Sequence, residues 1–193
     1  MFAERGYHGA TMQAVAERAG VSKGSVYDYF DSKDELLLGA AETLVAALSE
    51  QNLRVLEHSS GPLRERIAAF VDSITAGLAE WTDVCFSLLQ AWAELGPGHD
   101  HPLHELFARS YRASTDRIQA VFDESVARGE VEPFATRAAA LALLAAIDGT
   151  LLQSIILPDE QRQAAGTGVF TSWCASIVPA PAPRRTKPEE NTE

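Results

Sequence analysis

The segment from Thr11 to Lys33 reads TMQAVAERAGVSKGSVYDYFDSK, and it decides the fold of the N-terminal part of the chain. Thr11 and Ser22 are N-cap candidates for two short helices, because a side-chain hydroxyl accepts a hydrogen bond from a free amide of the first turn. Gly20 supplies the turn between them, where a left-handed backbone is least costly without a Cβ. Two such helices form a helix-turn-helix, which lays its second helix in the major groove of DNA.

The polar residues of the second helix fit this interpretation. Lys23, Ser25, Tyr27 and Tyr29 lie around its exposed part, and a helix N-terminus favours a phosphate. A small apolar contact is expected to join the two helices, formed by Ala14, Val15, Ala19, Val21 and Val26. From the pattern alone, a tight helical hairpin that packs inside a core is an equal alternative.

The rest of the chain also predicts helices. Ala, Leu, Glu, Arg and Gln dominate, and almost no segment alternates apolar and polar residues as a strand would. The expected elements are a helix end over 1–5 stopped by Gly6, helices over 12–19, 23–30, 33–57, 63–80, 81–95, 102–128, 134–157 and 159–178, and a disordered Pro-rich tail over 179–193. The predicted fold class is therefore all-α.

Composition limits the functional classes. The chain has 193 residues and a formal net charge of -11, which taken alone argues against a nucleic-acid-binding protein. Residues 1–35 carry four basic and six acidic side chains, so any cations that meet DNA must be few and well placed. The N-terminus lacks the pattern of a signal peptide, and no apolar run reaches a membrane-spanning length. A cytoplasmic protein without membrane association is expected.

Other chemistry is weakly indicated. Cys85 and Cys174 each lie in an apolar helical pattern and are interpreted as reduced core residues. His99, His101 and His104 are of a zinc-ligand type, but they follow a Gly-Pro-Gly loop that is expected to be solvated, so no metal is predicted. No nucleophile elbow, P-loop or dinucleotide fingerprint occurs. Neither an enzyme nor a cofactor is predicted.

Two runs of sequence carry a family resemblance. The run 2–12, FAERGYHGATM, and the run 15–37, VAERAGVSKGSVYDYFDSKDELL, closely resemble the DNA-binding region of the TetR family of transcriptional regulators. The order of the later helices and Asp148-Gly149 are similar to the family less specifically. The resemblance implies an N-terminal helix-turn-helix DNA-binding domain over 1–45 and a helical ligand-binding and dimerisation domain over 46–178.

The resemblance also implies which side chains meet double-stranded operator DNA. Tyr27 and Thr11 are expected at phosphates, Lys23 and Ser25 near bases, and Lys33 at the DNA backbone. The full expected set is Thr11, Gln13, Lys23, Gly24, Ser25, Tyr27, Tyr29 and Lys33. Asp28 departs from this chemistry, and it either accepts from a cytosine amino group or faces solvent beside the DNA.

The first helix is a second departure. The family usually has two more turns of helix before the position of Phe2, often with a basic arm in front, so either the first helix is truncated here or its start lies upstream of Met1. Weaker and more salt-sensitive DNA binding would follow. The alternative function is a dimeric small-molecule-binding protein that has lost DNA binding through this truncation.

The resemblance further implies a pocket for a small effector in the core domain. Ligand occupancy would change the separation of the two recognition helices, which must be about 34–36 Å to read a palindromic operator. The candidate lining is Phe70, Ile74, Phe86, Gln90, Trp92, Phe107, Tyr111 and Asp148. Their apolar surroundings indicate a hydrophobic or amphipathic effector, although an aromatic stripe at helical spacing is more often ordinary core.

The last two helices, over 134–157 and 159–178, are expected to form a homodimer. The first contributes Leu141, Leu144, Ile147, Leu151, Leu152 and Ile155, and the second contributes Val169, Phe170, Trp173 and Ile177. Two such pairs would make an isologous four-helix bundle. The alternative is that these side chains fill the core of a monomer.

Overall fold

The computed structural model describes residues 2–94, 101–156 and 176–179, and its ordered elements are helices. They are α1 Phe2–Gly9, α2 Met12–Ala19, α3 Lys23–Tyr27, α4 Lys33–His58, α5 Leu63–Glu94, α6 Pro102–Ala127 and α7 Thr136–Ile156. The described residues contain no strand. The all-α prediction is confirmed.

Two element boundaries were predicted wrongly, and the N-terminal helix extends further than expected. The helices expected over 63–80 and 81–95 are one helix, α5, because residues 78–94 contain no glycine or proline to interrupt it. Gly6 interrupts the helix at the N-terminus as expected, because its φ of 67° and ψ of 177° are not helical, but helical residues resume after it and α1 extends to Gly9. The second helix of the pair, α3, ends at Tyr27 rather than Phe30. The expected final helix over 159–178 and the expected tail over 179–193 lie almost wholly outside the described residues.

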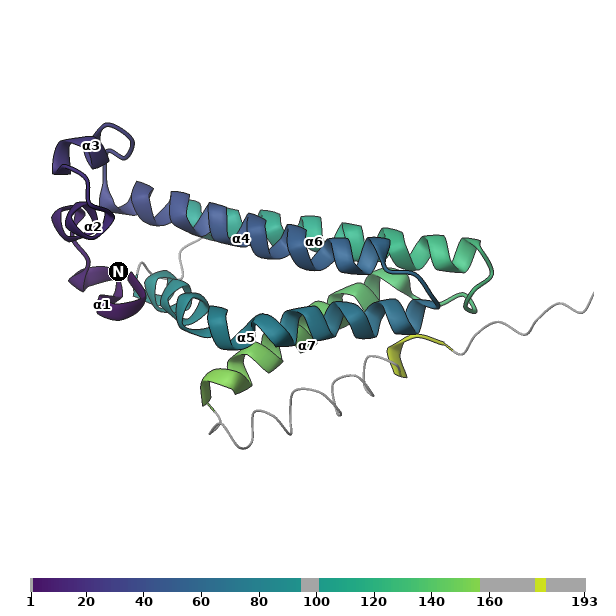
Figure 1. Cartoon of the computed structure of the whole chain (residues 1–193). Helices are drawn as coiled ribbons and strands as arrows, with labels where there is room; N and C mark the ends of the chain where they lie inside the picture. The colour runs from purple at the N-terminus through teal and green to yellow at the C-terminus, as the bar shows by residue number, and fades with distance from the viewer. Residues whose placement is uncertain (1, 95–100, 157–175, 180–193) are drawn as a thin grey trace, which may run out of the picture.

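The long helices form one body, with the three short helices at one end (Figure 1). The main core lies where the C-terminal half of α4 meets α5, α6 and α7. Its largest fully buried side chains include Leu56, Leu63, Ile118, Phe122 and Leu143. The first four come from apolar stripes at helical spacing, as expected for helices that bury one face, whereas Leu143 belongs to α7, which is apolar on most sides.

A second apolar cluster joins the short helices to this body. Tyr7 of α1 and Leu37 of α4 are buried against Leu88 and Ala91 near the end of α5. The helix α4 runs without interruption across residue 45, so the predicted boundary between 1–45 and 46–178 falls inside a helix. The two parts therefore share both an element and a core.

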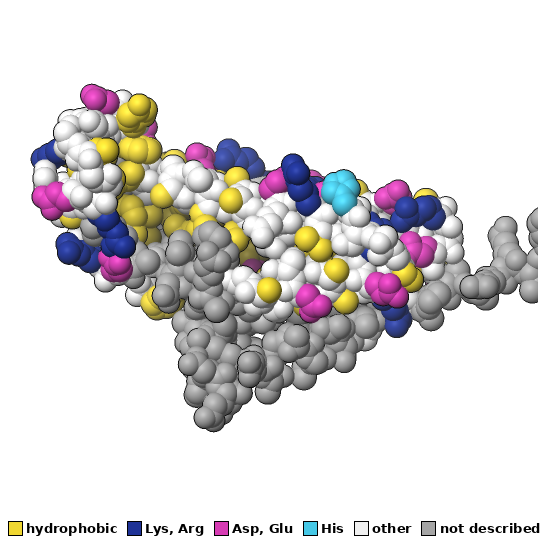
Figure 2. All heavy atoms as spheres, viewed as in Figure 1, with side chains coloured by type: hydrophobic (Ala, Val, Ile, Leu, Met, Phe, Trp, Pro, Cys, Tyr) yellow, Lys and Arg dark blue, Asp and Glu magenta, His cyan; other side chains and the backbone are white. Residues whose placement is uncertain are grey.

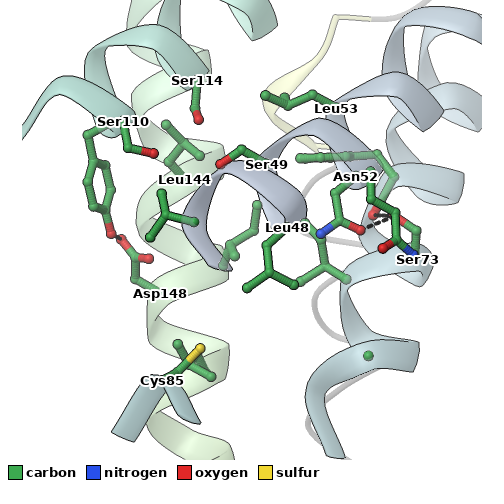
Figure 3. A pocket seen from close by; sticks show the side chains of 18 of the residues that line it. Leu48, Ser49, Asn52, Leu53, Ser73, Cys85, Ser110, Ser114, Leu144 and Asp148 are labelled. Carbon is green, nitrogen blue, oxygen red and sulfur yellow. Dashed lines mark hydrogen bonds between the residues drawn. The ribbon is translucent and has the colours of Figure 1, made fainter. Parts of the chain in front are cut away.

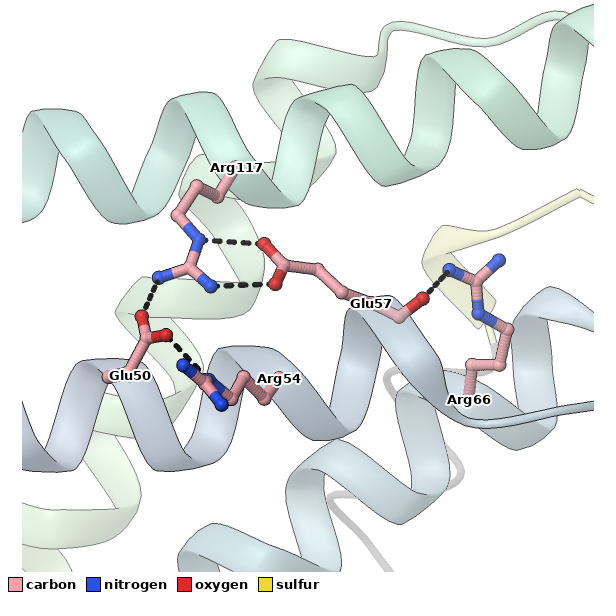
Figure 4. A network of polar contacts seen from close by, with 5 residues as sticks. All are labelled: Glu50, Arg54, Glu57, Arg66 and Arg117. Carbon is pink, nitrogen blue, oxygen red and sulfur yellow. Dashed lines mark hydrogen bonds and ion pairs between the residues drawn. The ribbon is translucent and has the colours of Figure 1, made fainter.

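A polar network holds the other end of α4 (Figure 4). Arg117 of α6 donates from Nε and Nη2 to both carboxylate oxygens of Glu57 at 2.6 Å, and from Nη1 to Glu50 at 2.9 Å. The Arg117 guanidinium lowers the pKa of the Glu57 carboxyl group. The buried Arg66 of α5 donates to the carbonyl of Leu56 at 3.1 Å. The C-terminal end of α4 is thus fixed to both α5 and α6.

None of the helices in the described ranges has a stretch that is both long enough and apolar enough to cross a membrane.

Candidate functional site

The helix-turn-helix forms from the caps that its sequence predicts. The Thr11 hydroxyl accepts from the amide of Ala14 at 3.1 Å, and the Ser22 hydroxyl accepts from the amide of Ser25 at 3.0 Å. Gly20 ends α2 with a left-handed φ of 70°. These contacts satisfy amides that a helix leaves free at its start, and they fix where α2 and α3 begin.

The apolar contact between the two helices differs from the predicted one. Met12 and Ala16 of α2 and Val26 of α3 are buried together, with Phe30 packed against them. Of the predicted set, only Val26 is buried. The turn directs toward α3 the face of α2 that carries positions 12 and 16, and the predicted residues of α2 lie on other faces. Val21, which is 48% exposed, lies on the outer side of the turn.

Two tyrosines project from this end of the molecule. Tyr29 is 80% exposed and Tyr27 is 44% exposed, and the Lys23 ammonium lies 5.6 Å from the centre of the Tyr27 ring. Exposed aromatic side chains beside a lysine are available for contact with a partner. Thr11, Gln13 and Gly24 are also exposed, whereas Ser25 is half-buried.

Lys33, the predicted contact to the DNA backbone, is engaged inside the protein. Its ammonium donates to the Tyr7 carbonyl at 2.9 Å and lies 4.0 Å from the centre of the Tyr7 ring. The Tyr7 hydroxyl donates to the carboxylate of Asp34. Burial and then the Asp34 hydrogen bond raise the pKa of Tyr7 to about 12. Lys33 and Asp34 thus join the start of α4 to α1, and a DNA contact by Lys33 stays a prediction.

The charge of this end is mixed (Figure 2). The Arg18 guanidinium pairs with the Glu4 carboxylate, and Gln13 donates to Glu17 at 2.8 Å. Over α4 and α6, acidic and basic side chains also lie next to one another, as in the pair of Arg109 with Glu42. Because Arg18 and Lys33 are engaged by the protein, Lys23 is the basic side chain best placed on α3 for a phosphate or a base.

A cavity of about 270 Å³ lies between α4, α5, α6 and α7 (Figure 3). Its apolar wall includes Val45, Leu48, Leu53, Phe70, Ile74, Phe107, Leu144, Ile147 and Leu151. Its polar wall includes Ser49, Gln51, Asn52, Ser73, Cys85, Ser110, Tyr111, Ser114 and Asp148. Apolar walls with a few polar groups are typical of small-molecule sites.

Five of the eight predicted pocket residues line this cavity: Phe70, Ile74, Phe107, Tyr111 and Asp148. The other three do not. Phe86 and Gln90 are exposed, and Trp92 packs against the cluster that joins α1 to α5. The reason is that the side of α5 that faces the cavity ends at Cys85, while Leu88, Ala91 and Trp92 in its last turns pack in the cluster with α1.

The cavity also has small polar lining residues that the sequence did not predict, on α4 and α6. Ser110 and Ser114 lie one turn apart on α6, and Ser49 and Asn52 lie one turn apart on α4. In sequence such residues resemble an ordinary solvated helix face. A usable signal was that each pair follows the same helical stripe as apolar neighbours such as Phe107 and Leu53.

Asp148 and Tyr111 are paired at the cavity wall. The Tyr111 hydroxyl donates to Oδ2 of Asp148 at 2.5 Å. Burial raises the pKa of both groups, and the hydrogen bond from Tyr111 acts in the opposite direction on the pKa of Asp148. Burial also raises the pKa of the Cys85 thiol, which lines the cavity instead of filling a core. Cys174 lies outside the described residues.

The helix α7 divides its apolar side chains between two faces. Leu144 and Ile147 face the cavity, whereas Leu141 and Leu152 are each 52% exposed and Ile156 is 68% exposed. The predicted dimer stripe therefore has an inward half and an outward half. Of the second predicted stripe, Val169, Phe170 and Trp173 lie outside the described residues, and Ile177 packs on the core.

The histidine cluster is described only in part. His101 is the N-cap of α6, and its Nδ1 accepts from the amide of Leu103 at 3.1 Å. His99 lies outside the described residues.

Two family profiles match the chain. One is described as bacterial regulatory proteins of the tetR family and matches residues 1–40. The other is described as the C-terminal part of BetI-type transcriptional repressors and matches residues 62–179. Together they cover the helix-turn-helix and most of the body that holds the cavity.

Individual relatives agree with these profiles. The transcriptional regulator BetI of Serratia proteamaculans is 28% identical over 173 residues, which are 88% of this chain and 83% of that protein. The transcriptional activator FasR of Mycolicibacterium smegmatis is 42% identical over 77 residues, which are 38% of this chain and 35% of that protein. The crystal structure of a TetR transcription regulator from Haloarcula marismortui has the same fold, with a TM-score of 0.76, 20% identity and 92% coverage of both chains.

The capped helices α2 and α3 have the geometry of a helix-turn-helix, and a helical body lies behind them. The two family profiles match these same two parts of the chain. The chain belongs to the TetR family of transcriptional regulators.

Proposed function

We propose that this protein is a repressor that binds palindromic operator DNA as a homodimer and releases it when a small hydrophobic or amphipathic effector occupies the α4–α7 cavity. The observation that carries the proposal is the path of α4. Its first turn contacts Tyr7 beside the helix-turn-helix, and its middle section, from Val45 to Leu53, lines the cavity. A ligand that moves α4 therefore acts on the position of α2 and α3.

The contacts along α4 support transmission toward the DNA. Its C-terminal end is held by Arg117 and Arg66, and its N-terminal end is held to α1 through Lys33 and Asp34. Displacement of the section between them is transferred most easily to the short helices, which have less core around them. The ligand would then shift a population between two separations of the recognition helices, and DNA would reciprocally weaken ligand binding.

The family profile that matches residues 62–179 is that of BetI-type transcriptional repressors, which supports repression over activation. The relative FasR is named an activator, so a reporter assay is needed. A promoter fusion should be less active with the protein than without it. Higher activity with the protein would contradict repression and leave DNA binding intact.

The DNA part is tested by fluorescence anisotropy. Labelled duplexes from the promoter of the chain's own gene are compared with unrelated duplexes of equal length, at about 50 mM and about 200 mM salt. Tighter binding to the promoter duplexes, weakened by salt, is expected. Equal affinity for both kinds of duplex would contradict operator binding and favour the alternative, a dimeric small-molecule-binding protein.

A further inference from the structure

The cavity holds one carboxylate and, among its described lining residues, no Lys, Arg or His. That carboxylate belongs to Asp148, on α7, and it lies beside apolar walls from three other helices (Figure 3). Asp148 is exposed, so water reaches its carboxylate. A ligand that covers it would remove this water, and a carboxylate that loses its water is costly unless a cation or several hydrogen bonds replace it. A cationic ligand therefore suits this cavity better than a neutral or anionic one.

The protein satisfies this carboxylate only in part. The Tyr111 hydroxyl donates one hydrogen bond to Oδ2 at 2.5 Å. A carboxylate offers about four acceptor positions on its two oxygens. One phenol therefore leaves most of the acceptor capacity of Asp148 to a ligand or to water.

Basic side chains on the same helix as Tyr111 are paired with other carboxylates, among them Arg112, which pairs with Glu105 at 3.0 Å. Arg109 pairs with Glu42 at 3.3 Å, and Arg117 pairs with Glu50 and Glu57. The pairs of Arg109 and Arg117 lie along a separate surface groove between α4 and α6. The guanidinium groups are thus balanced by their own carboxylates and do not neutralise Asp148.

The remaining walls also suit a ligand that joins a positively charged group to an apolar part. The rings of Phe70, Phe107 and Tyr111 line the same space. The face of an aromatic ring attracts a cation, most strongly where water is excluded. Leu48, Ile74 and Leu144 offer apolar surface to the rest of the molecule.

We infer that the ligand of this cavity is a small amphipathic amine, whose protonated nitrogen donates an N–H to the Asp148 carboxylate while its apolar body packs against Phe70 and Phe107. The inference rests on the proposed function, in which this cavity is the effector site, and it names the chemical class of that effector.

The test uses matched probes and isothermal titration calorimetry with the full chain. The probes are 4-phenylbutylamine, the neutral 4-phenylbutan-1-ol, the anionic 4-phenylbutanoate, and the N,N,N-trimethyl derivative of the amine. The amine is expected to bind about tenfold more tightly than the alcohol, as one charge-assisted hydrogen bond would give. The quaternary derivative, which has the charge but no N–H, is expected between them.

Two variants assign the preference to its residue. In Asp148→Asn the amine and the alcohol should bind within about twofold of each other, because the amide keeps the shape and removes the charge. In Tyr111→Phe, which keeps the carboxylate, the preference for the amine should persist. Circular dichroism confirms that each variant is folded before titration.

Several results would overturn the inference. They are equal or tighter binding of the alcohol or the carboxylate to the folded wild type, no binding of the amine, an unchanged amine preference in Asp148→Asn, or equal binding of the amine and its quaternary derivative. The proposed function is judged separately by anisotropy with promoter DNA. If the amine binds through Asp148 and leaves DNA affinity unchanged, the ligand class stands and the effector mechanism fails.

Discussion

At the scale of single residues, the DNA-binding end depends on very few cations. Residues 1–35 carry more acidic than basic side chains, and two of the four basic ones, Arg18 and Lys33, contact other parts of the protein. Lys23 is exposed on α3 beside Tyr27. Arg5 and Lys23 remain exposed, and Lys23 is the one on α3, so we expect it to contribute a large share of any attraction to DNA.

We expect Lys23→Ala to weaken binding to promoter DNA about five- to tenfold and to reduce the slope of log affinity against log salt by about 1. The matched control is Arg54→Ala, which removes one exposed positive charge from α4, where Arg54 pairs with Glu50. Anisotropy titrations at several salt concentrations measure both. An equal loss in the two variants would show that overall charge matters and that α3 has no special role.

The second residue-scale prediction concerns the pH dependence of stability. Burial raises the pKa of Asp148 above its ordinary value, so its folded form binds the proton more tightly than its unfolded form. Stability from such a group is present below the unfolded pKa and is lost as pH rises through the folded pKa. Tyr111 and Cys85, the other titratable groups of the cavity wall, have raised pKa values and stay protonated in this range.

Asp148 is exposed, so water screens part of this effect, and Asp148→Asn should raise the Tm by no more than about 1 °C at pH 7. The difference should vanish below about pH 4, roughly the pKa of an unfolded aspartate. Asp116→Asn is the control, because Asp116 is exposed on α6 and pairs with Arg137 at 2.9 Å. Thermal unfolding across pH measures both. A gain in Tm that is independent of pH would refute the assignment to ionisation of Asp148.

At the scale of elements, polar contacts fix the C-terminal end of α4 to both α5 and α6. Arg117 binds Glu57 with two hydrogen bonds and Glu50 with a third, and its side chain is 32% exposed. A two-point guanidinium–carboxylate pair that is partly shielded from water contributes more than an ordinary surface pair. This contact fixes the register of α4 against α6.

Arg117→Ala should lower the free energy of unfolding by about 1–2 kcal/mol. Arg112→Ala, on the same helix, removes an exposed pair with Glu105 and should cost less than about 0.5 kcal/mol. Urea unfolding followed by circular dichroism gives both values. Similar costs in the two variants would mean that the network in Figure 4 adds no more than a surface ion pair.

At the scale of the whole molecule, α7 presents an apolar face that points away from the cavity. Leu141, Leu152 and Ile156 are more than half exposed in the described structure. Exposed apolar side chains that gather on one helix favour contact with a second molecule. In the proposed homodimer, this face would meet the same face of the partner chain.

Leu152→Glu should convert a dimer into a monomer in sedimentation equilibrium and abolish tight binding to a two-half-site operator. Ala120→Glu introduces the same charge at an exposed position of α6 and should leave the dimer intact. A wild-type chain that sediments as a monomer, or a Leu152→Glu variant that remains a dimer, would exclude α7 as the dimer contact.

The sequence by itself determined the fold class, the family, and the starts of α2 and α3. Those features depend on local chemistry: hydroxyl caps at Thr11 and Ser22, the left-handed turn at Gly20, and the order of residues in 2–37. It also identified Tyr111 and Asp148 as polar groups on apolar stripes. Such signals need only neighbours within one or two helical turns.

Only the tertiary structure decided which face of each helix meets which partner. A helical stripe is the same whether it faces a cavity, a core or another molecule, so Trp92 and Phe86 could not be separated from Phe70 in sequence. The engagement of Lys33 by Tyr7 joins residues 26 apart in the chain, and no local pattern encodes it. The packing of whole helices fixes these orientations. An apolar stripe on an isolated helix is compatible with several neighbours, and only the assembled fold determines which one it contacts.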